Sequence, residues 1–367
     1  MNAEIIYLYA FDIAQEADLQ KIEAMLRGSA ERYEFGRLKD APRSFPMYRP
    51  LSIRLDAMTA KGVAGPMKLF ASVKLFAIGA MSIKVRMPVV CDQLSELQKY
   101  HDAVMEDGAT LDQRVFEIAR RTFDNILPAL DTPVDKLQPP EGYTVFCISA
   151  PPGKAAETDS ELWLRSHERE VAGLLVGEAD PARLSNQEVQ DTTRCCYSYY
   201  KRDLAVIDWD AALLIDAPEE YNDTLYVIEA ANLQLEELRV YDTRLDQALD
   251  KAYDDVERAA RPLVFSGRQR VLDELRAIRM DITKVADEIS NITKFFGDWH
   301  LARVYMGCAT RFHLAEWENM VSSKLRALDN LYTMLQQDSA SRAMILLDLA
   351  IVGLFVLDLI IILIGTR

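Results

Sequence analysis

The sequence predicts an α+β body with an antiparallel sheet, followed by long coiled-coil-like helices and one C-terminal transmembrane helix. Apolar and polar residues alternate in the first half, apolar residues recur in heptads in the second half, and a nearly continuous apolar run closes the chain. The expected segments are an α+β domain over 1–135, a second α+β segment over 141–217, a long helical hairpin and stalk over 218–342, and a transmembrane helix over 343–365.

The alternation in the first half indicates strands with one apolar and one wet face. Apolar residues occupy every second position of 51–55 and again of 83–87. Such strands are typical of antiparallel sheets, because parallel strands covered on both faces tend to be continuously apolar. Helices are expected near 92–104 and 110–129, and the proline-rich stretch LDTPVDKLQPPEGY is the candidate linker to the next segment.

Long helices are expected from Pro218 onward, because a proline followed by acidic residues suits a helix start. A second apolar run covers 271–299, and a third helix carries leucine or valine at sevenfold spacing from Leu314. The same stripe suits a free coiled coil or one face of a globular bundle, so both remain open. Asp242 interrupts a core position and is a candidate for fixing register or oligomer state. The helix expected from Pro218 carries apolar residues at two heptad core positions. One position holds Ile228, Leu235, Leu249 and Val256, and the other holds Ala231, Leu238, Leu245, Ala252 and Ala259.

The run 343–365 exceeds the roughly 20 residues that a helix needs to cross a bilayer. A buried core helix is the alternative, although such helices usually carry a polar face. Asp348 and Asp358 interrupt the run, and carboxylates inside a membrane are costly and suggest a function. No basic residue precedes Lys21, which argues against a secretory signal. The sequence thus predicts a tail-anchored, single-pass membrane protein with its bulk on the cytoplasmic side.

Composition indicates a folded, acidic protein. The chain is 50% hydrophobic and 27% charged, with a formal net charge of −15, which argues against binding the phosphate backbone of a nucleic acid. Its five cysteines show no disulfide-framework spacing and are expected to be reduced thiols. APPGKAAE lacks the serine or threonine of a phosphate loop, and His167 has no second histidine at metal-binding spacing. No catalytic, cofactor-binding or metal-binding residue is therefore predicted.

Two stretches resemble the "required for meiotic nuclear division" family and its bacterial YagE-type relatives: DAPEEYNDTLYVIEAANLQLEELRVYDTRLDQAL, and SSKLRALDNLYTMLQQDSASRAMILLDLAIVGLFVLDLII at the end. The resemblance covers roughly 200–365. It implies a mixed α/β body, long helices and one C-terminal membrane segment, with no defined catalytic residues. That family carries two glutamates ten residues apart in this segment, and the resemblance places Asp348 and Asp358 at those positions. This sequence departs from the family at Leu349, where the family usually has a tryptophan.

These observations favour a non-enzymatic scaffold, held at a membrane, that recruits a partner at the cytoplasmic face. The expected partners are the membrane and either a second copy of the chain or another protein, but no nucleic acid. The alternative is an oligomeric ion pathway that uses the intramembrane Asp348 and Asp358. A soluble enzyme with an anchor is a third possibility, and no constellation of residues in the sequence supports it.

Overall fold

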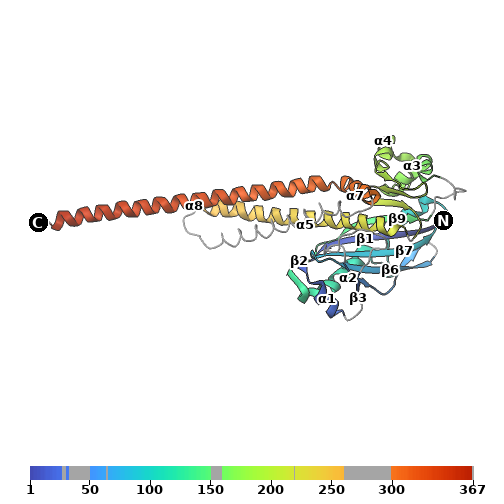
Figure 1. Cartoon of the computed structure of the whole chain (residues 1–367), viewed down its shortest axis with the longest axis horizontal. Helices are drawn as coiled ribbons and strands as arrows, with labels where there is room; N and C mark the ends of the chain where they lie inside the picture. Colours follow the sequence, from blue (N-terminus) through green and yellow to red (C-terminus); the bar gives the residue numbers. More distant parts are fainter. Residues whose placement is uncertain are drawn as a thin grey trace. The chain divides into compact units, whose positions relative to one another are not determined.

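The computed structural model describes most of the chain, whose course is shown in Figure 1. Its contacts divide it into two compact units: Met1–Val240 with Lys284–Trp317, and Tyr241–Thr283 with Glu318–Arg367. The described residues are 1–26, 30–32, 50–62, 65–149, 159–218, 220–259 and 299–365.

The first unit is built on one large sheet, and a small second sheet pairs β2 with β8. The strands are β1 (Asn2–Asp12), β2 (Ala14–Ala17), β3 (Ala30–Arg32), β4 (Leu51–Arg54), β5 (Met58–Gly62), β6 (Gly65–Leu75), β7 (Ala80–Val90), β8 (Leu130–Pro133), β9 (Glu141–Ile148), β10 (Cys196–Tyr197), β11 (Leu204–Ile207) and β12 (Ala211–Ile215).

The helices include short ones between strands and long ones after β12. They are α1 (Leu19–Met25), α2 (Leu111–Ile126), α3 (Ser160–Val176), α4 (Asn186–Thr192), α5 (Tyr221–Ala259), α7 (Trp299–Arg311) and α8 (Leu314–Gly365), with 3-10 helices η2 (Leu94–Tyr100), η3 (Leu127–Ala129) and η4 (Pro181–Arg183).

The large sheet has the strand order β10-β11-β12-β9-β1-β7-β6-β4-β3, with β5 paired to β6. All its neighbours are antiparallel except β12 and β9, which run parallel. The sheet is therefore mixed, and the prediction of an antiparallel sheet is wrong. The chain passes from β9 through α3, α4, β10 and β11 before it forms β12, and a connection of this length allows β12 to run parallel to β9. The antiparallel pairing of β1 with β9 joins strands from 1–135 and 141–217 in one sheet.

One face of the sheet carries the main apolar core. Alternate residues of the central strands, such as Tyr7, Ile83 and Phe146, are buried there with apolar residues of α2, η2 and α3. A capping box at the start of α2, formed by Thr110 and Gln113, fixes where that helix begins. This face follows the ordinary rule that a sheet buries one apolar side against helices.

The opposite face is covered by the first part of α5. Glu229 accepts hydrogen bonds from Lys74 on β6 and Ser82 on β7, at 2.5 and 2.6 Å. Farther along α5, Arg239 pairs with Glu141 of β9. Part of the face that the alternating sequence suggested to be solvent-exposed is therefore covered by a helix, which explains why Lys74 on this face forms an ion pair.

The turn between β6 and β7 requires glycine. Gly79 has φ +80°, a left-handed conformation that favours glycine. A Cβ atom at Gly79 would lie 2.0 Å from the carbonyl oxygen of Ala14. This turn sets the register in which Lys74 lies opposite Ser82, so both side chains can donate to Glu229 of α5.

The second unit contains the later part of α5 and most of α8. Leu245 and Ala252 are buried as the heptads predict, whereas Leu249 is half-buried. Lys324 of α8 lies 2.6 Å from carboxylate oxygens of both Asp242 and Asp246. The predicted apolar run 271–299, except for its last residue, lies outside the described residues.

Within the described ranges, none of the helices combines the length and the apolar character needed to cross a bilayer. The prediction of a transmembrane helix over 343–365 is therefore wrong, and so is the tail-anchored, single-pass location drawn from it. These residues are instead the last turns of α8, which begins at Leu314. The two carboxylates divide the run, and the stretch 349–357 between them is less than half of the roughly 20 residues that a span requires.

Candidate functional site

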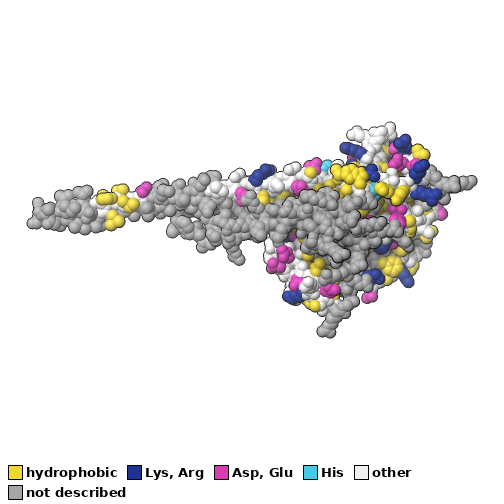
Figure 2. Space-filling model, in the orientation of Figure 1, with side chains coloured by type: hydrophobic (Ala, Val, Ile, Leu, Met, Phe, Trp, Pro, Cys, Tyr) yellow, Lys and Arg dark blue, Asp and Glu magenta, His cyan; other side chains and the backbone are white. Residues whose placement is uncertain are grey.

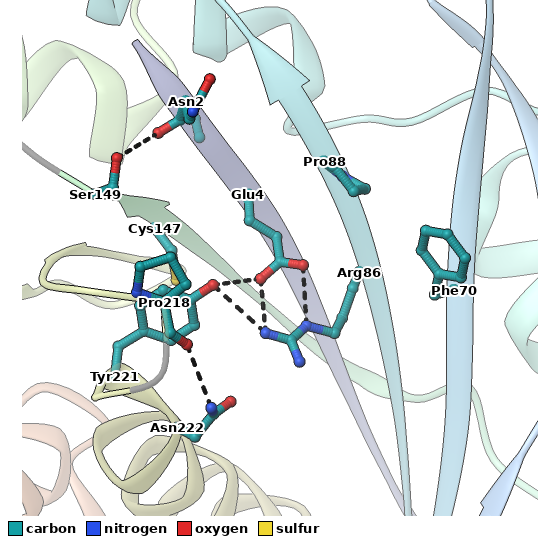
Figure 3. Close-up of a pocket in the computed structure, with 11 residues that line it drawn as sticks. Asn2, Glu4, Phe70, Arg86, Pro88, Cys147, Ser149, Pro218, Tyr221 and Asn222 are labelled. Carbon is teal, nitrogen blue, oxygen red and sulfur yellow. Dashed lines mark hydrogen bonds and ion pairs between the residues drawn. The ribbon is translucent and has the colours of Figure 1, made fainter.

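A pocket of about 740 Å³ opens at the end of the sheet where α5 begins (Figure 3). It lies on the face that α5 covers, and it is contained within the first unit. Its lining combines charged and polar groups with apolar side chains from four strands and the start of α5. The lining residues are Asn2, Ala3, Glu4, Phe70, Arg86, Pro88, Cys147, Ser149, Pro218, Tyr221 and Asn222.

The floor of the pocket is a hydrogen-bonded ion pair. Arg86 donates to the Glu4 carboxylate through Nε at 3.1 Å and through Nη2 at 2.7 Å. Tyr221 donates its hydroxyl to the same carboxylate at 2.5 Å. In Figure 3 the three side chains point toward one another from β1, β7 and α5. Both oxygens of Glu4 are thus used inside the floor.

The sheet register produces this arrangement. Ile6 of β1 lies opposite Arg86, so Glu4 is the diagonal neighbour of Arg86 on the same face. Tyr221 is the first residue of α5, and a backbone hydrogen bond from its N–H to the Ala217 carbonyl at 3.3 Å fixes the turn before it. The network therefore also fastens the start of α5 to the sheet.

The electrostatics of the floor keep Arg86 charged and the Tyr221 phenol protonated. Burial acts to lower the pKa of Arg86, but the hydrogen bond and charge of Glu4 outweigh it and raise that pKa. Burial, helped by the bond to Glu4, raises the pKa of Tyr221, so its phenol stays protonated. The floor therefore offers a constant pattern of charge and hydrogen-bonding groups near neutral pH.

The walls are largely apolar. Phe70 is 50% exposed, and it stands in Figure 3 on the side of the pocket away from α5, near Pro88. The Cys147 thiol is buried on β9, where burial raises its pKa well above the ordinary value. A protonated buried thiol is a poor nucleophile, so Cys147 contributes packing rather than reactivity.

A second ion pair continues along the same face of the sheet. Lys74 and Glu229 are each 2% exposed, and the Lys74 ammonium also lies 5.1 Å from the ring centre of Tyr226. Burial acts to raise the pKa of Glu229, but the charges of Lys74 and Lys84 outweigh it and lower that pKa. Glu229 is therefore ionised in a place where water is largely excluded.

Lys84 lies between the two ion pairs, on the same strand and face as Ser82 and Arg86. Burial lowers its pKa to about 8, and the charge of Lys74 acts in the same direction. Among the described residues, its ammonium has no hydrogen-bond or ion-pair partner. We refer to the five residues Glu4, Lys74, Lys84, Arg86 and Glu229 as the ion cluster.

The chemistry of the site is that of ion pairs and hydrogen bonds. Within the part of the chain that the structure describes, no group of three or more His, Cys, Asp or Glu side chains could hold a metal ion. Cys195 is buried and Cys196 is half-buried, and both are free thiols. Cys196 belongs to β10, which lies at the edge of the sheet and four strands from β1.

None of the residues singled out in the sequence is among those that line the pocket. Asp242 belongs to the ion pair with Lys324 in the second unit. Asp348 is exposed on α8, and the side chain of Asp358 lies outside the described residues.

Sequence reasoning missed the ion cluster, although two signals were present. Ser82, Lys84 and Arg86 alternate with apolar residues, and this pattern was interpreted as a solvent-facing side. Glu229 stands inside the apolar stretch LYVIEAANLQL, as Asp242 stands inside its heptad. A charge at such a position predicts a buried partner, and a basic strand face supplies one.

Comparison with known proteins gives one family and one curated relative. The family described as "Uncharacterized protein MJ0711, N-terminal domain" matches residues 2–222, more than half of the chain. Uncharacterized protein MJ0711 of Methanocaldococcus jannaschii is 24% identical over 247 residues, which cover 67% of this chain and 73% of that protein. No solved structure matches the chain. The resemblance to the meiotic-nuclear-division and YagE-type family is therefore wrong, because it relied on loose helical and apolar patterns.

Proposed function

Since the chain belongs to the MJ0711 N-terminal domain family, whose matched residues include every residue that lines the pocket, we propose that it is a non-enzymatic binding module for a small ligand. One observation carries this proposal: the pocket has apolar walls above a floor whose polar groups are already fixed in place. Its volume of about 740 Å³ also falls in the range of roughly 300 to 1,000 Å³ that is typical of small-molecule sites.

Binding is favoured over catalysis by the chemistry of the lining. Among the described residues that line the pocket, there is no histidine, and the thiol of Cys147 is protonated. Both carboxylate oxygens of Glu4 already accept hydrogen bonds from Arg86 or Tyr221. An activated nucleophile needs an adjacent base, and this lining provides no such pair.

The test is ligand binding by the full chain, with a fragment library followed by ligand-observed NMR. Phe70→Ser removes an exposed apolar wall, and Val90→Ser is the matched control, because Val90 is 79% exposed and lies outside the lining. We expect aromatic fragments to bind the unaltered chain and Val90→Ser equally, and Phe70→Ser about five- to tenfold more weakly. Equal binding to all three chains, or no binding at all, would contradict the proposal.

Recruitment of a second copy of the chain is the second candidate function, and an exposed aromatic cluster favours it. Tyr200 and Trp299 are 74% and 76% exposed. The ring centre of Tyr199 lies 4.7 Å from that of Tyr200 and 5.7 Å from that of His300, the residue after Trp299. Figure 2 shows hydrophobic side chains at the surface over α7, close to basic ones. The basic Lys201 and Arg202 beside this cluster complement the acidic remainder of a chain with net charge −15.

Sedimentation velocity of the full chain at micromolar concentration tests this candidate. We expect the unaltered chain to self-associate and the double substitution Tyr200→Ser with Trp299→Ser to sediment as a monomer. Tyr253→Ser is the control, because Tyr253 is also exposed but belongs to the second unit. A monomeric unaltered chain would remove this candidate.

A further inference from the structure

The ion cluster holds three cationic side chains and two carboxylates. Glu4 is matched by Arg86 and Glu229 by Lys74, so the charge of Lys84 has no counterpart within the cluster. An unpaired charge in a partly buried position is unfavourable, and proteins commonly relieve it with a counter-ion or a change of protonation. The cluster therefore carries one more positive charge than negative charges.

Arg86 also has N–H donors that its bonds to Glu4 do not use. Its Nε and Nη2 atoms bond to Glu4, and Nη2 also lies 3.4 Å from the Tyr221 hydroxyl, whereas Nη1 has no partner among the described residues. Figure 3 shows this third nitrogen directed away from Glu4. Arginine donates through a planar fork of five N–H groups, which matches the oxygens of carboxylates and phosphates.

These two observations concern one place. Arg86 lines the pocket, and Lys84 is two residues along the same strand face, where the side chains are neighbours. Lys84 interacts electrostatically with Glu4 and Arg86, and with Cys147, which also lines the pocket. The pocket thus has one free donor group at its floor and an unmatched positive charge next to it.

We propose that the pocket ligand carries an anionic group, a carboxylate or a phosphate, which accepts hydrogen bonds from Arg86 Nη1 and compensates the positive charge of Lys84. This inference depends on the proposed binding function and adds the chemical class of the ligand. The apolar wall at Phe70 and Pro88 suits a ring or short chain attached to that group. The first turn of α5 lines the same pocket, and a helix start favours an anion.

The experiment compares matched probes on the full chain by isothermal titration calorimetry. Benzoate and phenyl phosphate supply the two anionic groups, and benzamide is the neutral analogue. We expect at least one of the anions to bind the unaltered chain about tenfold more tightly than benzamide. The arm with the higher affinity identifies the group as carboxylate or phosphate.

Three substitutions connect the preference to Lys84. Lys84→Met is expected to reduce the tenfold preference to threefold or less, and Lys84→Arg to keep it. Lys136→Met removes the same charge from an exposed loop residue outside the cluster and is expected to leave the preference unchanged. If circular dichroism shows that Lys84→Met is unfolded, the unaltered chain and Lys84→Arg still allow the affinities for the anions and for benzamide to be compared.

The outcomes separate this inference from the function on which it depends. Equal affinity of the unaltered chain for benzamide and for both anions would overturn the anionic ligand while leaving a pocket that binds. A preference that survives Lys84→Met unchanged would overturn the role of Lys84. Absence of binding by every probe, together with a failed fragment screen, would remove the binding function itself.

Discussion

The two faces of the large sheet are made by alternate residues of the same strands, yet they are stabilised in different ways. The face toward α2, η2 and α3 is buried mainly through apolar side chains, such as Ile83 and Val85 of β7. The face toward α5 carries Ser82, Lys84 and Arg86 from that same strand. Because side chains alternate across a strand, one short segment can specify an apolar core and an ion cluster at once.

The difference teaches which contacts hold elements together and which fix their position. Apolar packing is non-directional and roughly proportional to buried area, so it tolerates small sliding of one element on another. An ion pair such as Lys74 with Glu229 is satisfied only in one register. We therefore interpret the ion cluster as the feature that fixes α5 on the sheet, and with it the position of Tyr221 at the pocket.

The largest expected effect comes from Glu229→Gln. This change removes the counter-charge that Glu229 provides to the buried Lys74 ammonium beside Lys84. Removal of one partner of a buried pair costs about 3 to 5 kcal/mol in the free energy of unfolding. Urea denaturation measures it. The double substitution Lys74→Met with Glu229→Leu removes both charges, and we expect it to recover most of the loss. A double variant as unstable as the single one would show that the charges themselves are needed.

On the apolar face, Ile83→Ala is expected to lower the free energy of unfolding by about 2 to 4 kcal/mol. Ile83 is fully buried, so the loss combines the missing apolar contact with the cavity left behind. Because no ionisable group takes part, the loss should be the same at pH 6 and pH 9. A loss that changed with pH between these values would mean that the two faces are coupled through the sheet.

Lys84→Met is expected to stabilise the chain by about 1 to 2 kcal/mol at pH 7 and by much less at pH 10. The pKa of Lys84 falls from 10.5 to about 8 on folding, so protonating it below pH 8 opposes folding. That cost disappears as the pH rises from about 8 to 10.5. The charged groups around it are Lys74, Glu229, Arg86 and Glu4. Thermal unfolding at several pH values measures the effect, and a gain that stays constant across this window would contradict the assigned pKa.

Much of the fold could be predicted from the sequence, because periodicity records burial. The alternation over 51–55 and 83–87 predicted strands β4 and β7. The acidic residues after Pro218 predicted a helix from Pro218 onward, and in the structure that helix begins at Tyr221. The parallel pair of β9 and β12 could not be predicted, because pairing partners distant in sequence leave no local signal. The prediction of a transmembrane helix over 343–365 was wrong because it depended on the length of the apolar run and gave too little weight to the two carboxylates that divide it.

The site was harder to predict than the fold. Glu4 and Tyr221 meet at one carboxylate although more than half of the chain separates them, and only the sheet register and the start of α5 bring them together. Arg86 was visible only as one polar residue on an alternating strand. A polar face covered by a helix and a polar face covered by water have the same period of two, so the sequence pattern alone does not distinguish them.

The smallest expected effect concerns Asp242, where the same pair chemistry occurs with more access to water. At a heptad core position, a polar residue such as Asp242 would cost stability in an apolar seam. In the structure, Asp242 and Lys324 are 17% and 21% exposed, and Lys324 also bonds to Asp246. Burial acts to lower the pKa of Lys324, but its bonds to the two carboxylates outweigh it and raise that pKa.

We therefore expect Asp242→Leu to lower the free energy of unfolding by less than about 1 kcal/mol, because Asp246 still pairs with Lys324 after the change. The double substitution Asp242→Leu with Asp246→Asn should cost more than the two single changes together, since it leaves Lys324 without a carboxylate from this group. Thermal unfolding of all three variants at low and high salt measures this coupling. A higher melting temperature for Asp242→Leu would restore the interpretation of Asp242 as a costly polar residue in an apolar seam. A loss as large as that of Glu229→Gln would instead show that pairing, and not burial, sets the cost of losing a carboxylate in this protein.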